Sequence, residues 1–248
     1  MKKAAVLISG EPRFCTEFDH IINNLKGFDQ IDYYFYIWNK SNTHPNYDVI
    51  SPSWFNIESA QWAIDKIQNN LPAGHYVAGL ELVDQTQFQY PNKPHPGYIN
   101  PRHIWIMYEG NYGAWKMCKD PDSYDLIIRA RPDVMIDKEV DLVEVKNRLE
   151  QQPLSIFSGG AHSTNGYGYK INDWVGIGLP STMRIYCDVI NCMEEYANRG
   201  ITVHGETMLA YHLQDQGVHV HTNLFNAELR HLGQYVNNRY ISTFGRWQ

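Results

Sequence analysis

The chain has 248 residues, 43% of them hydrophobic and 19% charged, which is the composition of an ordinary globular protein. Its formal net charge of −6 argues against a general nucleic-acid binder, since such proteins need a basic stripe to displace counterions. No run approaches the roughly 20 apolar residues of a membrane helix, so we expect no membrane span.

The cysteines are expected to be reduced thiols in the cytoplasm. None of them has the paired CxxC spacing of a zinc site: they are Cys15, Cys118, Cys187 and Cys192. The apolar run at residues 4–8 is too short for the core of a secretory signal, and Glu11 and Arg13 follow it at once. We therefore expect this run to be the first strand of a cytoplasmic protein.

The first half of the chain alternates strand-like and helix-like segments. Apolar or aromatic runs predict strands at residues 4–9, 32–38, 76–83 and 124–130. Helical spacing predicts helices over 14–25, 57–71 and 104–115, and this order is typical of parallel β-α-β units. Gly110 and Gly113 lie inside the third helix, where each costs roughly 1 kcal/mol against alanine. We expect close packing of that helix on the sheet to require them.

The second half is expected to complete the same domain. Residues 140–149 suggest a helix over the sheet, 154–157 a short strand, and the glycine-rich segment 158–169 a mobile lid. A strand at 175–179 precedes a helix that begins at Pro180 and extends to Tyr196. A further helix follows His204, and residues 218–222 read as the last strand. No linker or repeat divides the chain, so a single domain is predicted.

The segment 124–137, YDLIIRARPDVMID, has the most informative pattern. A buried strand at Leu126-Ile127-Ile128 leads into Arg129, Arg131 and Asp133, which we expect to leave the sheet at its carboxyl edge. Ligands bind at that edge in open α/β sheets. The alternative is a solvated ion pair between Arg129 and Asp133, which would contribute little.

Other candidate residues follow later in the chain. Glu206 lies in the first turn of a predicted helix, where a capping role is about as expected as a catalytic one. His219 and His221 share one face of a predicted strand. They would bind a metal together with Asp133, or a substrate phosphate; the alternative is a pair of solvated or core histidines.

The arrangement resembles the glycosyltransferases of the GT-A fold. The resemblance is carried by AAVLISGEPRF, DYYFYIWN, YDLIIRARPDVMI, NDWVGIG and HGETMLAYHL, in that order along most of the chain. It implies a single Rossmann-like α/β domain over residues 1–248, with a mostly parallel sheet flanked by helices. Residues 1–137 would form the nucleotide-binding half and 138–248 the acceptor side. The implied activity moves a sugar from a nucleoside-diphosphate sugar to a hydroxyl of a glycan or another acceptor.

The resemblance also implies roles for particular residues. Gly10, Glu11 and Arg13 would lie beside the nucleotide. The family's Asp-x-Asp motif matches Arg131-Pro132-Asp133, so its first carboxylate is replaced by an arginine. Asp133 would hold Mn²⁺ or Mg²⁺ against the diphosphate, or Arg129 and Arg131 would supply the positive charge without a metal. We favour the metal-assisted alternative.

Asp173 or Glu206 is predicted to be the general base if the reaction inverts the sugar configuration. If the reaction retains it, these residues would orient sugar hydroxyls. The alternative function is a catalytically degenerate relative that binds a glycan or a nucleotide. An NAD-dependent enzyme is disfavoured because ISGEPRF offers one glycine of the three in the fingerprint, and a P-loop enzyme because no GxxxxGK[ST] occurs.

Overall fold

The structure is a computed structural model. It describes residues 1–10, 19–40, 64–65, 67–84, 87–88, 102–132, 134–159, 171–225, 227–229, 235–236 and 239–240. The glycine-rich segment that was expected to be a lid lies almost wholly outside the described residues, as does most of the helix expected over 57–71. Residues 64–65 and 67–69 of that helix are described and are helical.

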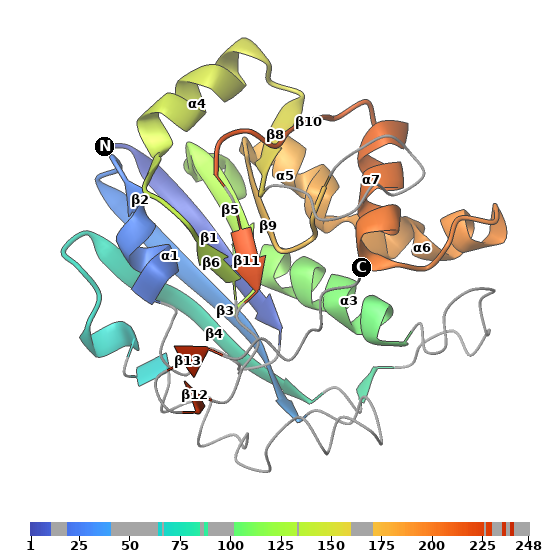
Figure 1. Cartoon of the computed structure of the whole chain (residues 1–248), viewed down its shortest axis with the longest axis horizontal. Helices are drawn as coiled ribbons and strands as arrows, with labels where there is room; N and C mark the ends of the chain where they lie inside the picture. The colour runs from blue at the N-terminus through green and yellow to red at the C-terminus, as the bar shows by residue number, and fades with distance from the viewer. Residues whose placement is uncertain are drawn as a thin grey trace.

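A seven-stranded sheet forms the centre of the molecule, in the order β10-β8-β9-β5-β1-β3-β4 (Figure 1). β9 runs antiparallel to both of its neighbours, and the other described pairings of this sheet are parallel. The predicted mostly parallel α/β sheet is therefore confirmed. Its strands are β1 (Lys3–Gly10), β3 (Gln30–Lys40), β4 (His75–Asp84), β5 (Leu126–Ala130), β8 (Ser155–Ser158), β9 (Val175–Gly178) and β10 (His219–His221).

Helices cover both faces of the sheet, so the domain has three layers (Figure 1). One apolar core lies under α1 (Asp19–Asn24) and α4 (Leu142–Gln151). The second core lies between the opposite face and four helices, which are α3 (Arg102–Met117), α5 (Pro180–Cys187), α6 (Val189–Asn198) and α7 (Gly205–Asp215). A 3₁₀ helix, η2 (Pro121–Ser123), precedes β5.

Short strands pair outside the main sheet. They form the pairs β2-β7, β6-β11 and β12-β13, with bounds β2 (Leu25–Lys26), β6 (Val134–Ile136), β7 (Val140–Asp141), β11 (Ala227–Leu229), β12 (Tyr235–Val236) and β13 (Arg239–Tyr240). The prediction that residues 218–222 form the last strand is therefore wrong. Strands of two or three residues are too short to show an alternating pattern in the sequence. The single helix expected from Pro180 to Tyr196 is also two helices, which meet at Asp188.

The order of the strands defines where a ligand is expected. From β1 the chain continues to β3 and β4 on one side, and it then returns to β5 on the other side of β1. Strand order therefore reverses between β1 and β5. In open α/β sheets, ligands bind outside the carboxyl ends of the strands at such a reversal.

The two glycines inside α3 are required by close packing on the sheet, as the sequence predicted. A Cβ at Gly113 would lie 2.4 Å from Cζ of Tyr36 on β3, which is inside van der Waals contact. At Gly110, the nearest atom would be Cζ2 of Trp38 at 3.2 Å. The helix can approach the aromatic side chains of β3 because both positions lack a side chain.

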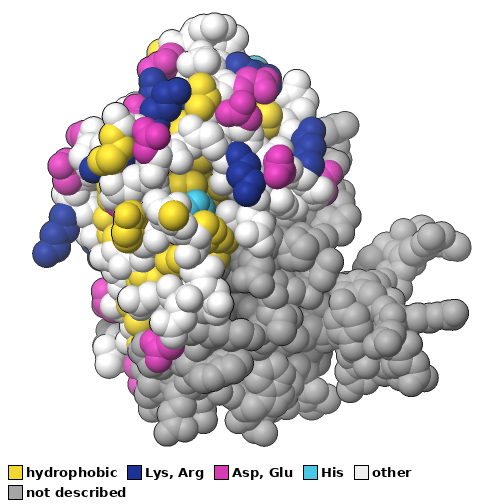
Figure 2. Space-filling model, turned by 90° about the vertical axis from the view of Figure 1, so that its left-hand side faces the viewer, with side chains coloured by type: hydrophobic (Ala, Val, Ile, Leu, Met, Phe, Trp, Pro, Cys, Tyr) yellow, Lys and Arg dark blue, Asp and Glu magenta, His cyan; other side chains and the backbone are white. Residues whose placement is uncertain are grey.

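The surface on the left-hand side of Figure 1 faces the viewer in Figure 2. Apolar side chains gather in the middle of its described part, and lysine and arginine side chains lie next to aspartate and glutamate ones. The described part of this face therefore carries no basic stripe. None of the described helices is long and apolar enough to cross a membrane.

We expect Gly113→Ala to lower the free energy of unfolding by about 1–3 kcal/mol, because the new methyl group must displace the Tyr36 ring. Gly110→Ala is the matched control. Its methyl group meets a looser contact, and the gain in helix propensity of about 1 kcal/mol offsets the strain. Urea unfolding of both variants measures the difference. Equal stabilities would contradict this account of the packing.

Candidate functional site

The candidate site lies at the carboxyl ends of β1 and β5, on the face covered by α3, α5 and α7. Successive side chains of a strand point to opposite faces. Leu7 of β1 and Ile127 of β5 pack in the core on the α3 side, so Ser9 and Arg129, two residues further on, point to the same side. Two polar side chains thus enter an apolar layer just below the edge of the sheet.

Arg129 has no exposed surface. Its Nε donates to Oδ1 of Asn111 at 2.8 Å, its Nη1 donates to the backbone carbonyl of Asp173, and Ser9 Oγ donates to the same Asn111 oxygen at 2.8 Å. The expectation that Arg129 leaves the sheet is therefore wrong. A buried guanidinium is tolerated when amide and carbonyl oxygens replace its hydration. In this conformation it does not reach solvent.

Arg131 and Gly10 lie at the edge itself. Arg131 is partly exposed, and its backbone N–H donates to the carbonyl of Trp174 at 2.9 Å. Gly10 has φ +139°, a conformation that favours glycine, and a Cβ there would lie 3.2 Å from Cδ of Pro132. The chain segments that leave β1 and β5 are therefore in contact, and Arg131 lies beside them.

The two predicted carboxylates come together at the start of α7. A Cβ on Gly205 would lie 2.5 Å from Oδ2 of Asp173, so the carboxylate packs directly against this glycine. Glu206 follows, with Oε2 3.1 Å from Nδ1 of His204. Burial raises the pKa of Glu206, the charge of Asp173 raises it further, and His204 and Arg131 oppose these effects. Asp173 and Arg131 thus both act electrostatically on Glu206.

His219 and His221 lie elsewhere. Their ring centroids are 4.8 Å apart. Val220, between them in the sequence, packs into the core on the α3 side, so both histidines point to the opposite face of the sheet, which α4 covers. His221 contacts the ring of Phe157 at 5.0 Å. β10 is also three strand spacings from β5, about 14 Å. The structure therefore does not bring the histidines to the carboxylates.

Three predicted residues, Glu11, Arg13 and Asp133, lie outside the described residues. The role of Asp133 as a ligand of Mn²⁺ or Mg²⁺ accordingly stays a prediction. In the described part of the chain, no group of three or more His, Cys, Asp or Glu side chains could hold a metal ion.

Sequence reasoning missed several residues of this site, above all Asn111, Tyr108 and His204. The hydroxyl of Tyr108 is fully buried and donates to the carbonyl of Gly205 at 2.6 Å, which ties α3 to the start of α7. Asn111 was recognisable, because it follows Tyr108 by three residues and thus lies on the buried stripe of α3. An amide on such a stripe needs a polar partner, and Arg129 is that partner.

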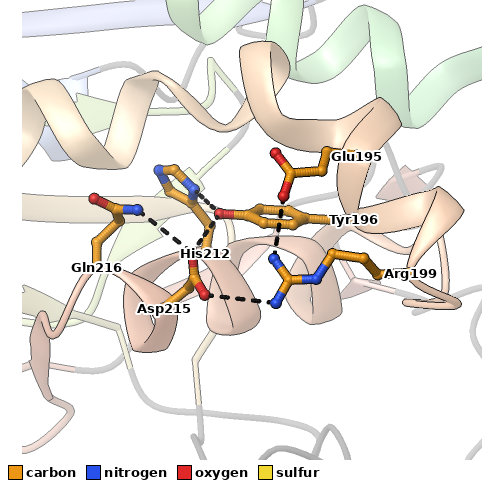
Figure 3. A network of polar contacts seen from close by, with 6 residues as sticks. All are labelled: Glu195, Tyr196, Arg199, His212, Asp215 and Gln216. Carbon is orange, nitrogen blue, oxygen red and sulfur yellow. Dashed lines mark hydrogen bonds and ion pairs between the residues drawn. The ribbon is translucent and has the colours of Figure 1, made fainter.

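A second polar network joins α6 to α7 (Figure 3), and a further hydrogen bond links it to α5. His212 is buried, its Nε2 lies 2.9 Å from the carbonyl of Ile185, and its Nδ1 lies 2.9 Å from the hydroxyl of Tyr196. Because a carbonyl only accepts, Nε2 carries the proton and Nδ1 accepts from Tyr196 in the neutral ring. Burial lowers the pKa of His212. Asp215 lies 3.3 Å from the same hydroxyl, and the network fastens the far end of α7.

Stability is expected to depend on pH through Glu206. Because its pKa in the folded protein is raised above the ordinary value of 4.5, the folded state binds the proton more tightly than the unfolded chain. The free energy of unfolding therefore falls as the pH rises from about 4.5 to the raised pKa, with a limiting slope of about 1.4 kcal/mol per pH unit. Glu206→Gln should remove this decline in the free energy of unfolding. Glu144→Gln, on the exposed face of α4, should leave the decline unchanged. Urea unfolding across this pH range tests both; identical profiles would contradict the assignment.

Tyr196→Phe is expected to lower the free energy of unfolding by roughly 1–3 kcal/mol, because Nδ1 of buried His212 loses its donor. The control is Tyr76→Phe, since Tyr76 is 55% exposed and its variant should change stability by less than about 0.5 kcal/mol. Thermal or urea unfolding measures both. A Tyr196→Phe protein as stable as the control would show that the network contributes nothing.

No protein-family model matches the chain, and no curated protein sequence matches it. The assignment of a function therefore rests on the arrangement of Arg131, Asp173 and Glu206 around the ends of β1 and β5.

Proposed function

We propose that the protein is a glycosyltransferase that moves a sugar from a nucleoside-diphosphate sugar to a hydroxyl of a glycan or another acceptor. One observation carries the proposal. A carboxylate, Asp173, and a partly exposed cation, Arg131, both act electrostatically on a second carboxylate, Glu206, at the point where strand order reverses. An anionic donor and a hydroxyl acceptor need these two kinds of group side by side.

Arg131 is the described residue best suited to the donor diphosphate. A guanidinium makes charge-assisted and often bidentate hydrogen bonds to phosphate oxygens. The contact between Gly10 and Pro132 brings the exits of β1 and β5 together next to it. A divalent ion, when bound, would neutralise charge on the departing diphosphate, and Asp133 is the residue proposed to hold it.

Glu206 is proposed as the general base of an inverting reaction. A base works best when its pKa lies near the working pH, and the pKa of Glu206 is raised toward that range by burial and by the charge of Asp173. His204, 3.1 Å from Glu206, fixes the orientation of the carboxylate. In a retaining reaction the same carboxylates would hold hydroxyls of the sugar.

We also propose that the protein works in the cytoplasm. Cys118 and Cys187 are buried free thiols and Cys192 is a partly buried one, which supports a reducing compartment. Burial raises the pKa of Cys118 to about 11 and that of Cys187 to about 12, so both stay protonated and unreactive at neutral pH.

The proposal is tested with uridine and guanosine diphosphate sugars, with and without Mn²⁺, by following release of the nucleoside diphosphate. Glu206→Gln should reduce kcat by about 10²-fold or more, because it removes the base. Glu144→Gln, the same change on the exposed surface of α4, should leave kcat unchanged. Equal losses in both variants would contradict the role of Glu206.

Binding of the nucleoside diphosphate is measured separately by calorimetry. Arg131→Gln should weaken it, whereas Arg184→Gln, on the exposed surface of α5, should not. Binding without turnover of any donor would favour the alternative, a degenerate relative that binds nucleotides or glycans. Absence of binding to any nucleoside diphosphate, with or without Mn²⁺, would rule out the transferase.

A further inference from the structure

Three hydrogen-bonding groups are buried together without partners on the α3 side of the sheet. They are Nη2 of Arg129 on β5, Nδ2 of Asn111 on α3 and the hydroxyl of Tyr186 on α5. None of the three makes a hydrogen bond of acceptable distance and angle to any residue that the structure describes. Each such group costs about 1–3 kcal/mol if it stays unsatisfied, and native proteins leave few of them.

The three groups belong to one cluster. Nε of Arg129 donates to Oδ1 of Asn111 at 2.8 Å, and Nη2 and Nδ2 are attached to the same guanidinium and the same amide. Across the sheet, Arg129 lies opposite Gly176 on β9, and a Cβ at Gly176 would lie 2.7 Å from the Tyr186 ring. The tyrosine ring therefore covers the strand position beside Arg129. The Arg129 guanidinium lowers the pKa of Tyr186 against the larger effect of burial, both through its charge and because it lies within hydrogen-bonding range of the hydroxyl, so the two groups are close together.

The chemistry of the cluster defines what it binds. The guanidinium nitrogen and the amide nitrogen only donate, and the hydroxyl can donate as well. Their common partner must therefore offer lone pairs, and it must be small because all three atoms are fully buried. Buried waters typically make about three hydrogen bonds to groups of this kind, and a halide ion accepts from the same donors.

We propose that Arg129, Asn111 and Tyr186 bind one small hydrogen-bond acceptor, a water molecule or a chloride ion, below the carboxyl ends of β1 and β5. The bound species links β5, α3 and α5 around the guanidinium. Because Nη1 of Arg129 also holds the carbonyl of Asp173, this internal site supports the segment that carries a candidate catalytic carboxylate. The inference does not require the proposed transferase activity.

A crystal structure of the full chain, grown in sodium bromide, tests the proposal directly. A single density peak is expected at about 2.7–3.3 Å from Nη2, Nδ2 and the Tyr186 hydroxyl. Anomalous scattering from the peak identifies a halide, and its absence identifies water; either result supports the site. No peak, or a direct hydrogen bond between the Tyr186 hydroxyl and Nη2, would overturn it.

Tyr186→Phe gives an independent test, because it removes one contact and leaves the ring over Gly176. The peak should disappear or lose occupancy in this variant, and the melting temperature should fall by about 2–4 °C. An unchanged peak would show that the hydroxyl is not a ligand. An unchanged or higher melting temperature would show that the hydroxyl is not hydrogen-bonded in the wild-type protein.

Discussion

The burial of the Arg129 charge is the constraint on which the rest of the site depends. β5 lies in the middle of the sheet, and the guanidinium enters the layer between the sheet and α3 with no exposed surface. Its hydration must be replaced by protein acceptors, and Asn111 and the carbonyl of Asp173 replace it. Since Asn111 also accepts from Ser9 of β1, one cation fixes α3, β1 and the segment before β9 to one another.

This arrangement also affects the pKa of Glu206, at the carboxyl edge of the sheet. Asp173 is held by its backbone while its carboxylate packs against Gly205, so its negative charge lies next to Glu206. That charge adds to the effect of burial on the pKa of Glu206. A buried ion is a costly way to stabilise a fold, because apolar side chains of similar volume often serve as well. Its evident effect here is to determine where Asp173 lies.

The sequence predicted the parts of this structure that local patterns specify. Continuous apolar runs identified the strands of the parallel half, and the glycines of α3 predicted close packing. Asp173, just before an expected strand, and Glu206, in the first turn of an expected helix, were grouped as candidate bases by the resemblance to the GT-A glycosyltransferases. The burial of Arg129 could not be predicted, because its acceptor, Asn111, lies 18 residues earlier on a helix. For His219 and His221, alternation predicted a shared face, but the packing of Val220 decided which face that is.

The reversed direction of β9 explains why Asp173 reaches the site. In a parallel strand, the residues that precede it lie at the amino edge of the sheet, far from a ligand at the carboxyl edge. β9 runs antiparallel to β5, so Asp173 and Trp174, just before its first residue, lie at the carboxyl ends of β1 and β5. The hydrogen bond from Arg131 N–H to the Trp174 carbonyl joins the end of one strand to the start of the other. One antiparallel strand in a mostly parallel sheet thus places a carboxylate at the carboxyl edge, where the other strands of the site contribute the residues that follow their ends.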